Sequence, residues 1–126
     1  MTENEANTIL DRTNFLLKNF PFEEAKFANN KISRRKPHLR AKHIFNRKVF
    51  FDIFKQKYNG INKRDKARRY EVILYLRDIF KNEIPNRKGN SFVYTTSKNH
   101  KSFILVVKNI KRRNNYELYL YSIYPI

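Results

Sequence analysis

The sequence has no cysteine and only two glycines among its 126 residues. Without cysteine the chain can form no disulfide, and it has neither thiolate ligands for structural zinc nor a cysteine nucleophile. Gly60 and Gly89 belong to no glycine-rich phosphate loop, which excludes nucleotide chemistry of the P-loop or kinase type, and no cofactor is expected. The histidines and the few carboxylates show no metal-ligand spacing, so we expect neither a metal site nor a two-metal nuclease.

Long apolar runs are also missing, since no stretch approaches the roughly 18 residues that cross a membrane. The polar, acidic start of the chain lacks the positive region and apolar core of a signal peptide. We therefore expect a cytoplasmic protein with no membrane partner. Eleven Phe and eight Tyr within an apolar fraction of 40% nevertheless predict a folded core, and the length suits one domain over residues 1–126.

Positive charge dominates the composition and is unevenly distributed. Twenty-eight Lys and Arg against 11 Asp and Glu give a net charge of +17, which favours a polyanionic partner such as RNA or DNA. Residues 1–24 hold five acidic and two basic side chains, whereas the intervals 25–51 and 84–116 contain no acid and hold nine and eight basic side chains. The two acid-free intervals are candidate anion-binding surfaces.

The spacing of apolar residues along the chain predicts an α+β fold, with N-terminal helices packed on one face of a small C-terminal antiparallel β-meander. The segment 1–24 contains an acidic amphipathic helix that ends at Pro21, and residues 25–45 form a basic loop. Residues 46–83 form two helices, the first over 46–58 and the second from Asn62 to the Ile84-Pro85 stop. Residues 90–126 form antiparallel strands over 91–96, 102–110 and 116–124. Strict alternation in the last strand groups Leu118, Leu120, Ser122 and Tyr124 on one face, and Tyr119, Tyr121 and Ile123 on the other.

The basic loop is interpreted either as a solvated linker or as a phosphate clamp, and the density of like charge favours the clamp. The predicted nucleic-acid-binding residues lie in this loop, in the basic helix that follows and in the strands: Arg34, Arg35, Lys36, His38, Arg40, Lys42, Arg47, Arg64, Arg68, Arg69, Lys101 and Lys108. Tyrosines of the last strand serve either as core packing or, on an open sheet face, as platforms that stack bases. The acidic helix either packs into the core or covers the basic surface.

His43 is the main candidate for acid-base chemistry, because it lies where the basic loop meets a predicted helix and the surrounding cations would keep it neutral. His100 is a second candidate. The alternative for this residue, which lies in a turn between two strands, is a purely structural role.

Several segments taken in order form a pattern: His43-Ile-Phe-Asn-Arg before a helix, the strand Phe103-Ile-Leu-Val-Val-Lys108, and the ending Tyr119-Leu-Tyr-Ser-Ile-Tyr-Pro-Ile126. Over about residues 38–126 this pattern resembles the metal-independent ribonucleases of the barnase, colicin D and RelE-like toxin group, particularly its phage and polymorphic-toxin branches. The resemblance implies a catalytic His43, with Ser122 and Tyr124 orienting the phosphate or relaying a proton. It implies that Lys98, Lys101 or Lys108 stabilises the developing charge.

Three functions remain open from the sequence. The first is an endoribonuclease that cleaves RNA by attack of the 2′-hydroxyl, which needs no metal ion and would have an acidic immunity or antitoxin partner. The second is a non-catalytic DNA- or RNA-binding protein, or an inhibitor of a nucleoprotein complex, from a mobile element. The third is a basic module that docks on an acidic protein or an anionic membrane surface.

Overall fold

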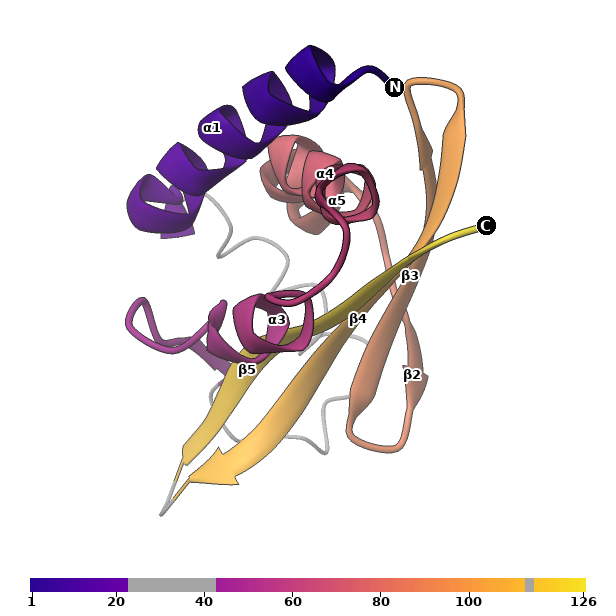
Figure 1. Ribbon diagram of the computed structural model, residues 1–126. Coiled ribbons are helices and arrows are strands. Elements are labelled where there is room, and N and C mark those ends of the chain that lie inside the picture. The colour runs from indigo at the N-terminus through magenta and orange to yellow at the C-terminus, as the bar shows by residue number, and fades with distance from the viewer. Residues whose placement is uncertain (23–42, 113–114) are drawn as a thin grey trace.

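A computed structural model describes residues 1–22, 43–112 and 115–126, and it confirms the α+β fold with helices on one face of a C-terminal sheet (Figure 1). The helices are α1 (Glu3–Asn19), α3 (Asp52–Lys57), α4 (Lys63–Tyr70), the 3-10 helix η1 (Glu71–Tyr75) and α5 (Leu76–Asn82). The strands are β1 (His43–Phe45), β2 (Asn86–Lys88), β3 (Ser91–Lys98), β4 (Lys101–Arg112) and β5 (Asn115–Pro125). None of the described helices is both long and apolar enough to cross a membrane.

The strands form one five-stranded sheet in the order β1-β5-β4-β3-β2. Strands β2 to β5 are antiparallel, and β3 to β5 correspond to the three predicted strands. At the far edge β1 pairs in parallel with β5, with His43 opposite Tyr116. The sequence predicted a loop at His43, and this is wrong, because a three-residue strand is too short to show a period of two. The rest of the predicted basic loop lies outside the described residues.

A β-bulge in β5 changes which residues share a face of the sheet. Val107 pairs with Leu120 and Val106 pairs with Ser122, so that Tyr121 is an extra residue in the ladder. Beyond the bulge Ile123 is buried on the same face as Leu120, whereas Ser122 lies on the opposite face. The strict alternation predicted for this strand is therefore wrong after Leu120, although Ser122 and Tyr124 do share a face.

The middle helices are shorter than the sequence predicts. Residues 47–51 are turns, and helix begins only at Asp52. The predicted long helix is divided into α4, η1 and α5, and Glu71, Val72 and Ile73 of η1 are all buried. A helix with one apolar stripe would not bury three consecutive residues. They are buried here because η1 packs among the helices, with α1 on one side of it.

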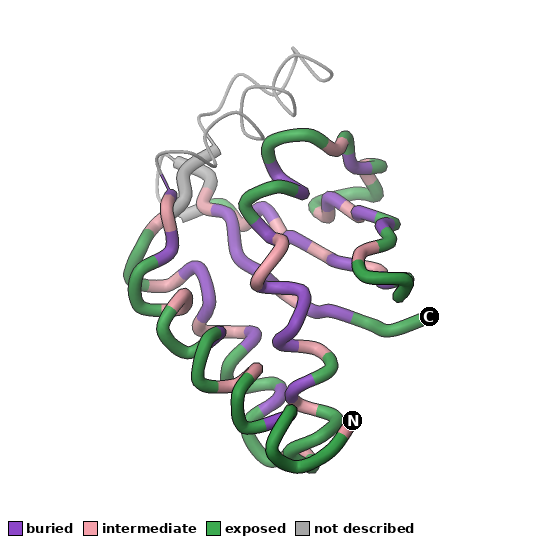
Figure 2. The backbone as a smooth tube through the Cα atoms, turned by 90° about the horizontal axis from the view of Figure 1, so that it is seen from above, coloured by how far each residue is buried: buried purple, intermediate pink, exposed green. Residues whose placement is uncertain are grey.

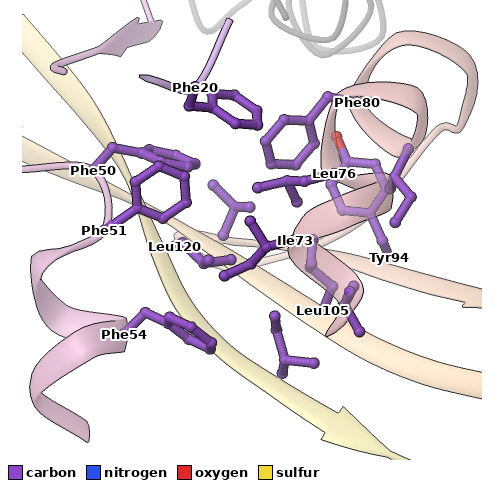
Figure 3. Packing of buried hydrophobic residues seen from close by; sticks show 14 of the residues in the cluster. Phe20, Phe50, Phe51, Phe54, Ile73, Leu76, Phe80, Tyr94, Leu105 and Leu120 are labelled. Atoms are coloured by element: carbon purple, nitrogen blue, oxygen red, sulfur yellow. The ribbon is translucent and has the colours of Figure 1, made fainter. Parts of the chain in front are cut away.

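Buried aromatic rings fill the space between the helices and the sheet (Figure 3). Phe50 is fully buried, and its ring lies within 6.4 Å, centroid to centroid, of those of Phe20, Phe22, Phe51 and Phe80. Exposed residues follow the periphery of the chain trace, and buried ones lie inside it (Figure 2). The core thus joins residues that are far apart in the sequence.

The acidic helix α1 packs on α4 and η1, on the side away from the sheet (Figure 1). Ala6 of α1 and Ala67 of α4 are both fully buried, as expected where two helices approach closely. Glu3 and Lys63 form an exposed ion pair of 3.7 Å between the same helices. Of the two interpretations of this helix, packing into the fold is confirmed.

Candidate functional site

The face of the sheet opposite the helices is the candidate site. Val93 on β3, Ile104 and Val106 on β4, and Tyr124 on β5 belong to this face by their register, and all are half-buried or exposed. None of the described helices lies on this face, because they all gather on the other one (Figure 1). A ligand can therefore approach the sheet here along β4 and β5.

Two lysines and two tyrosines gather on this face, and we call Lys57, Lys108, Tyr121 and Tyr124 the sheet-face cluster. The Lys108 ammonium lies 3.8 Å from the centroid of the Tyr121 ring, and the Lys57 ammonium lies 4.2 Å from the same centroid and 5.7 Å from that of Tyr124. The two nitrogens are therefore at most 8.0 Å apart, the sum of 3.8 and 4.2 Å. They are near enough to act on one nucleotide.

The charges of these two lysines are not neutralised within the described part of the chain. Every ion pair found there that includes a lysine involves Lys63, Lys98 or Lys101 instead. Cation–π contacts hold an ammonium near a ring but leave its net charge in place. Two like charges within 8.0 Å of one another favour an anion beside them.

Local structure explains how the cluster forms. Alternation from Leu120 places Tyr121 on the outer face, and the bulge at this residue then brings Ser122 and Tyr124 onto that face instead of the core face. Lys57 comes from the last turn of α3, which lies along the edge of β5 beyond the short β1 strand. Leu120 donates its backbone N–H to the carbonyl oxygen of Phe50, which fixes this edge before α3 begins.

Tyr58 and Arg69 hold the same edge. The Tyr58 hydroxyl donates to the Ile123 carbonyl oxygen at 3.3 Å and accepts from the Ile123 N–H at 3.4 Å. Arg69 donates to the same carbonyl oxygen, and its guanidinium lies 4.7 Å from the centroid of the Tyr58 ring. Arg69, predicted to bind nucleic acid, therefore closes the backbone edge of β5 and positions α3.

Tyr124 and Ser122 give the cluster its ionisable and polar groups. The Ser122 hydroxyl is the main group that lowers the pKa of Tyr124, burial is the next effect and opposes it, and the positive charges of Lys57 and Arg69 lower the pKa further. The phenol ring of Tyr124 is 40% exposed. Ser122 is fully buried, and its Oγ makes no hydrogen bond of normal geometry within the described residues. A lowered pKa means that the Tyr124 phenol ionises at a lower pH than an ordinary tyrosine, which favours its use in proton transfer.

Two predicted lysines serve the fold instead. On β3, Lys98 extends toward the helices, with its Nζ 2.9 Å from Oδ2 of Asp78 and 3.3 Å from Oε2 of Glu83. The Nζ of Lys101 lies 3.0 Å from Oε2 of the buried Glu71. These ion pairs connect the β3–β4 hairpin to η1 and α5, and they offset the charge of both lysines.

The predicted catalytic residues do not converge on one point. His43 pairs with Tyr116 at one end of β5, six residues before Ser122, which corresponds to about 20 Å along a strand. His100 lies at the opposite end of the sheet, in a two-residue turn in which Asn99 and His100 have φ of 52° and 62°. Ser122 and Tyr124 are brought together with Lys108, whereas both histidines and Lys98 lie elsewhere.

The remaining predicted binding residues are distributed as follows. Arg68, His100 and Lys101 line a separate pocket at the hairpin end of the sheet. Arg47 is exposed beyond β1, with its guanidinium 6.0 Å from the centroid of the Phe22 ring, and Arg64 is exposed on α4. Outside the described residues lie six of the predicted residues: Arg34, Arg35, Lys36, His38, Arg40 and Lys42.

Sequence reasoning missed Lys57 and did not assign Tyr121 to the site. Lys57 is one of many lysines on a predicted helix, and only its position before the buried Tyr58 hints that it lies at the edge of the sheet. The bulge that brings Ser122 and Tyr124 onto the same face as Tyr121 leaves no signal in the alternation of residue types.

The fold defines the chain as an α+β protein that presents a basic, tyrosine-bearing sheet face opposite its helices. In the described ranges, no three side chains of the His, Asp or Glu type lie together as metal ligands would. Comparisons with protein-family models, with curated proteins and with solved structures found no match for the chain.

Proposed function

We propose that the protein acts on RNA at the sheet-face cluster, as an endoribonuclease whose reaction uses no metal ion. The observation that carries the proposal is the exposed Tyr124 phenol, whose pKa is lowered next to two lysines that have no carboxylate partner among the described residues. Such a site combines a group that can transfer a proton with cations that can stabilise a phosphate.

Binding would rest on charge and on aromatic surface. Lys57 and Lys108 supply two ammonium groups for phosphates, and each phosphate bound would release condensed counterions. The rings of Tyr121 and Tyr124 give flat surfaces next to those cations, and bases of a single strand stack on such surfaces. Paired bases in a duplex present no free face, so the cluster favours unpaired RNA.

The chemistry assigns a role to each group of the cluster. The Tyr124 phenolate would take the proton of the ribose 2′-hydroxyl, and the 2′ oxygen would attack the adjacent phosphorus. The bond from phosphorus to the 5′ oxygen breaks, and that oxygen takes a proton from the Lys57 ammonium or from water. Lys108 would stabilise the negative charge of the pentacovalent intermediate. The products are a 2′,3′-cyclic phosphate and a 5′-hydroxyl, and DNA, which lacks the 2′-hydroxyl, would bind without being cut.

Binding of RNA or DNA without cleavage is the second candidate. It is favoured by the position of His43, which the resemblance to metal-independent ribonucleases would place at the site. His43 pairs with Tyr116, about 20 Å along β5 from Ser122. On either proposal the protein works in the cytoplasm, and an acidic immunity or antitoxin protein would bind over the same basic face.

Incubation of the folded protein with single-stranded RNA in EDTA decides between the two candidates. Cleavage should yield 2′,3′-cyclic phosphate ends, and Tyr124→Phe should slow it by about 100-fold or more, because it removes the proton-transfer group. Tyr75→Phe is the control, since Tyr75 is a partly buried phenol on the helical side. Intact RNA with salt-dependent binding would leave only the second candidate, and absence of both would refute the proposal.

A further inference from the structure

A pocket lies next to the sheet-face cluster and shares no residue with it. It is a pocket of about 340 Å³ at the hairpin end of the sheet, which we call the end pocket. Its lining comes from α4, from the β3–β4 hairpin and from the end of β5: Arg68, His100, Lys101, Ser102, Phe103, Pro125 and Ile126. The lining side chains include two cations and an imidazole, and no aspartate or glutamate.

The polar groups of the pocket are held by neighbouring structure. His100 is the second residue of the tight turn, where its left-handed backbone fixes the direction of the side chain. Lys101 is anchored by its ion pair with the buried Glu71. Arg68 is exposed, and its guanidinium pairs with Asp65, 3.6 Å away on the same exposed face of α4. An exposed ion pair of this kind contributes little, so the Arg68 guanidinium can exchange Asp65 for another anion.

The end pocket and the cluster are neighbours. Pro125 of the pocket directly follows Tyr124 of the cluster, and Arg68 directly precedes Arg69, whose charge acts on Tyr124. Tyr124 pairs with Ile104, and Ser102 of the pocket lies two residues further along β4, about 7 Å away. One nucleotide of an extended strand spans a distance of this size.

We propose that the end pocket is an anion subsite that binds the phosphate of the nucleotide next to the one held at the cluster. Arg68 is the main ligand, because its planar guanidinium suits bidentate contact with a phosphate and its present partner is weak. The apolar surface of Pro125 and Ile126 borders the site and suits the sugar or base of the same nucleotide. This inference rests on the proposed function and extends it, since it predicts that affinity depends on the length of the strand.

The test compares two lengths of 2′-O-methyl RNA, which cannot undergo attack by the 2′ oxygen and is therefore not cut. A dinucleotide has one phosphodiester and can occupy the cluster alone, whereas a hexanucleotide can reach the end pocket as well. Affinity of each would be measured by fluorescence anisotropy for the wild type, for Arg68→Gln and for Arg12→Gln. Arg12 is the control, because it is an exposed arginine of α1 that does not line the pocket, and its replacement removes the same charge. Thermal unfolding would confirm that both variants are folded.

We expect Arg68→Gln to weaken binding of the hexanucleotide by about tenfold, as for loss of a charged hydrogen bond, and to leave the dinucleotide unchanged. Arg12→Gln should change neither. An equal loss for both lengths would overturn the inference, because Arg68 would then belong to the cluster itself. No loss for either length would also overturn it while the proposed function stands. If the wild type binds neither RNA, the proposed function has failed as well.

Discussion

Replacement of lysines on the two faces of the sheet by methionine tests the assignment of the nucleic-acid interface. Within the described ranges Lys108 and Lys57 lie at the cluster without a carboxylate partner, whereas Lys98 faces the helices between Asp78 and Glu83. Methionine retains most of the aliphatic stem and removes only the charge. Because Lys98 is already neutralised within the fold, its loss should affect folding, and the loss of the other two should affect binding.

The expected magnitudes follow from counterion release. For single strands the logarithm of the binding constant falls with the logarithm of salt concentration by about 0.7 per phosphate neutralised. Lys57→Met and Lys108→Met should each reduce that slope by about 0.7, so that the affinity lost between 50 and 200 mM salt becomes about threefold smaller. Lys98→Met should leave the slope unchanged and reduce the free energy of unfolding by up to about 1 kcal/mol, as for a largely solvated ion pair.

The assay is a salt titration of 2′-O-methyl RNA binding by fluorescence anisotropy, with urea unfolding of the same variants. If Lys98→Met reduced the slope as much as Lys108→Met does, RNA would not distinguish the two faces of the sheet. The assignment of the interface to the outer face would then be refuted.

Further predictions concern proton transfer, ion pairing and packing. The cleavage rate of the wild type should rise with pH toward the lowered pKa of Tyr124, because the phenolate is the active form, and Tyr124→Phe should lose this rise in a pH–rate profile. Hydrogen bonding to Lys98 is the main cause that lowers the pKa of Asp78 below its ordinary 3.8, so the pair stabilises the fold above that pH and loses its effect as the pH falls through the folded value. Urea unfolding should show Asp78→Asn less stable than the wild type at pH 7, with the difference disappearing in acid. Phe50→Ala should cost about 3–5 kcal/mol in the same assay, because it removes a fully buried ring, whereas Phe15→Ala, at a side chain 65% exposed, should change stability by less than about 0.5 kcal/mol.

Helices and strands with a regular spacing of apolar residues were predictable, because that spacing is a relation between residues close together in the chain. The helix α1 and the strands β3 to β5 match the predicted segments to within a few residues at each end. Strands β1 and β2 were missed, since three residues carry no period. The long helix is divided at η1, where Glu71 pairs with Lys101 of the sheet. That contact joins residues 30 positions apart, and no local pattern records it.

The sequence by itself determined the class of the fold, the excess of positive charge and the presence of tyrosines and lysines in the last strands. Only the tertiary structure decided which of those lysines carry charge available to a ligand. Lys98 and Lys108 are both strand lysines in one acid-free interval, but the first meets two carboxylates of α5 and the residue after it, whereas the second meets Tyr121 on the open face. The physical reason is that neutralisation depends on groups brought from distant parts of the chain, and the β5 bulge, which no alternation reveals, sets the face on which Ser122 and Tyr124 lie.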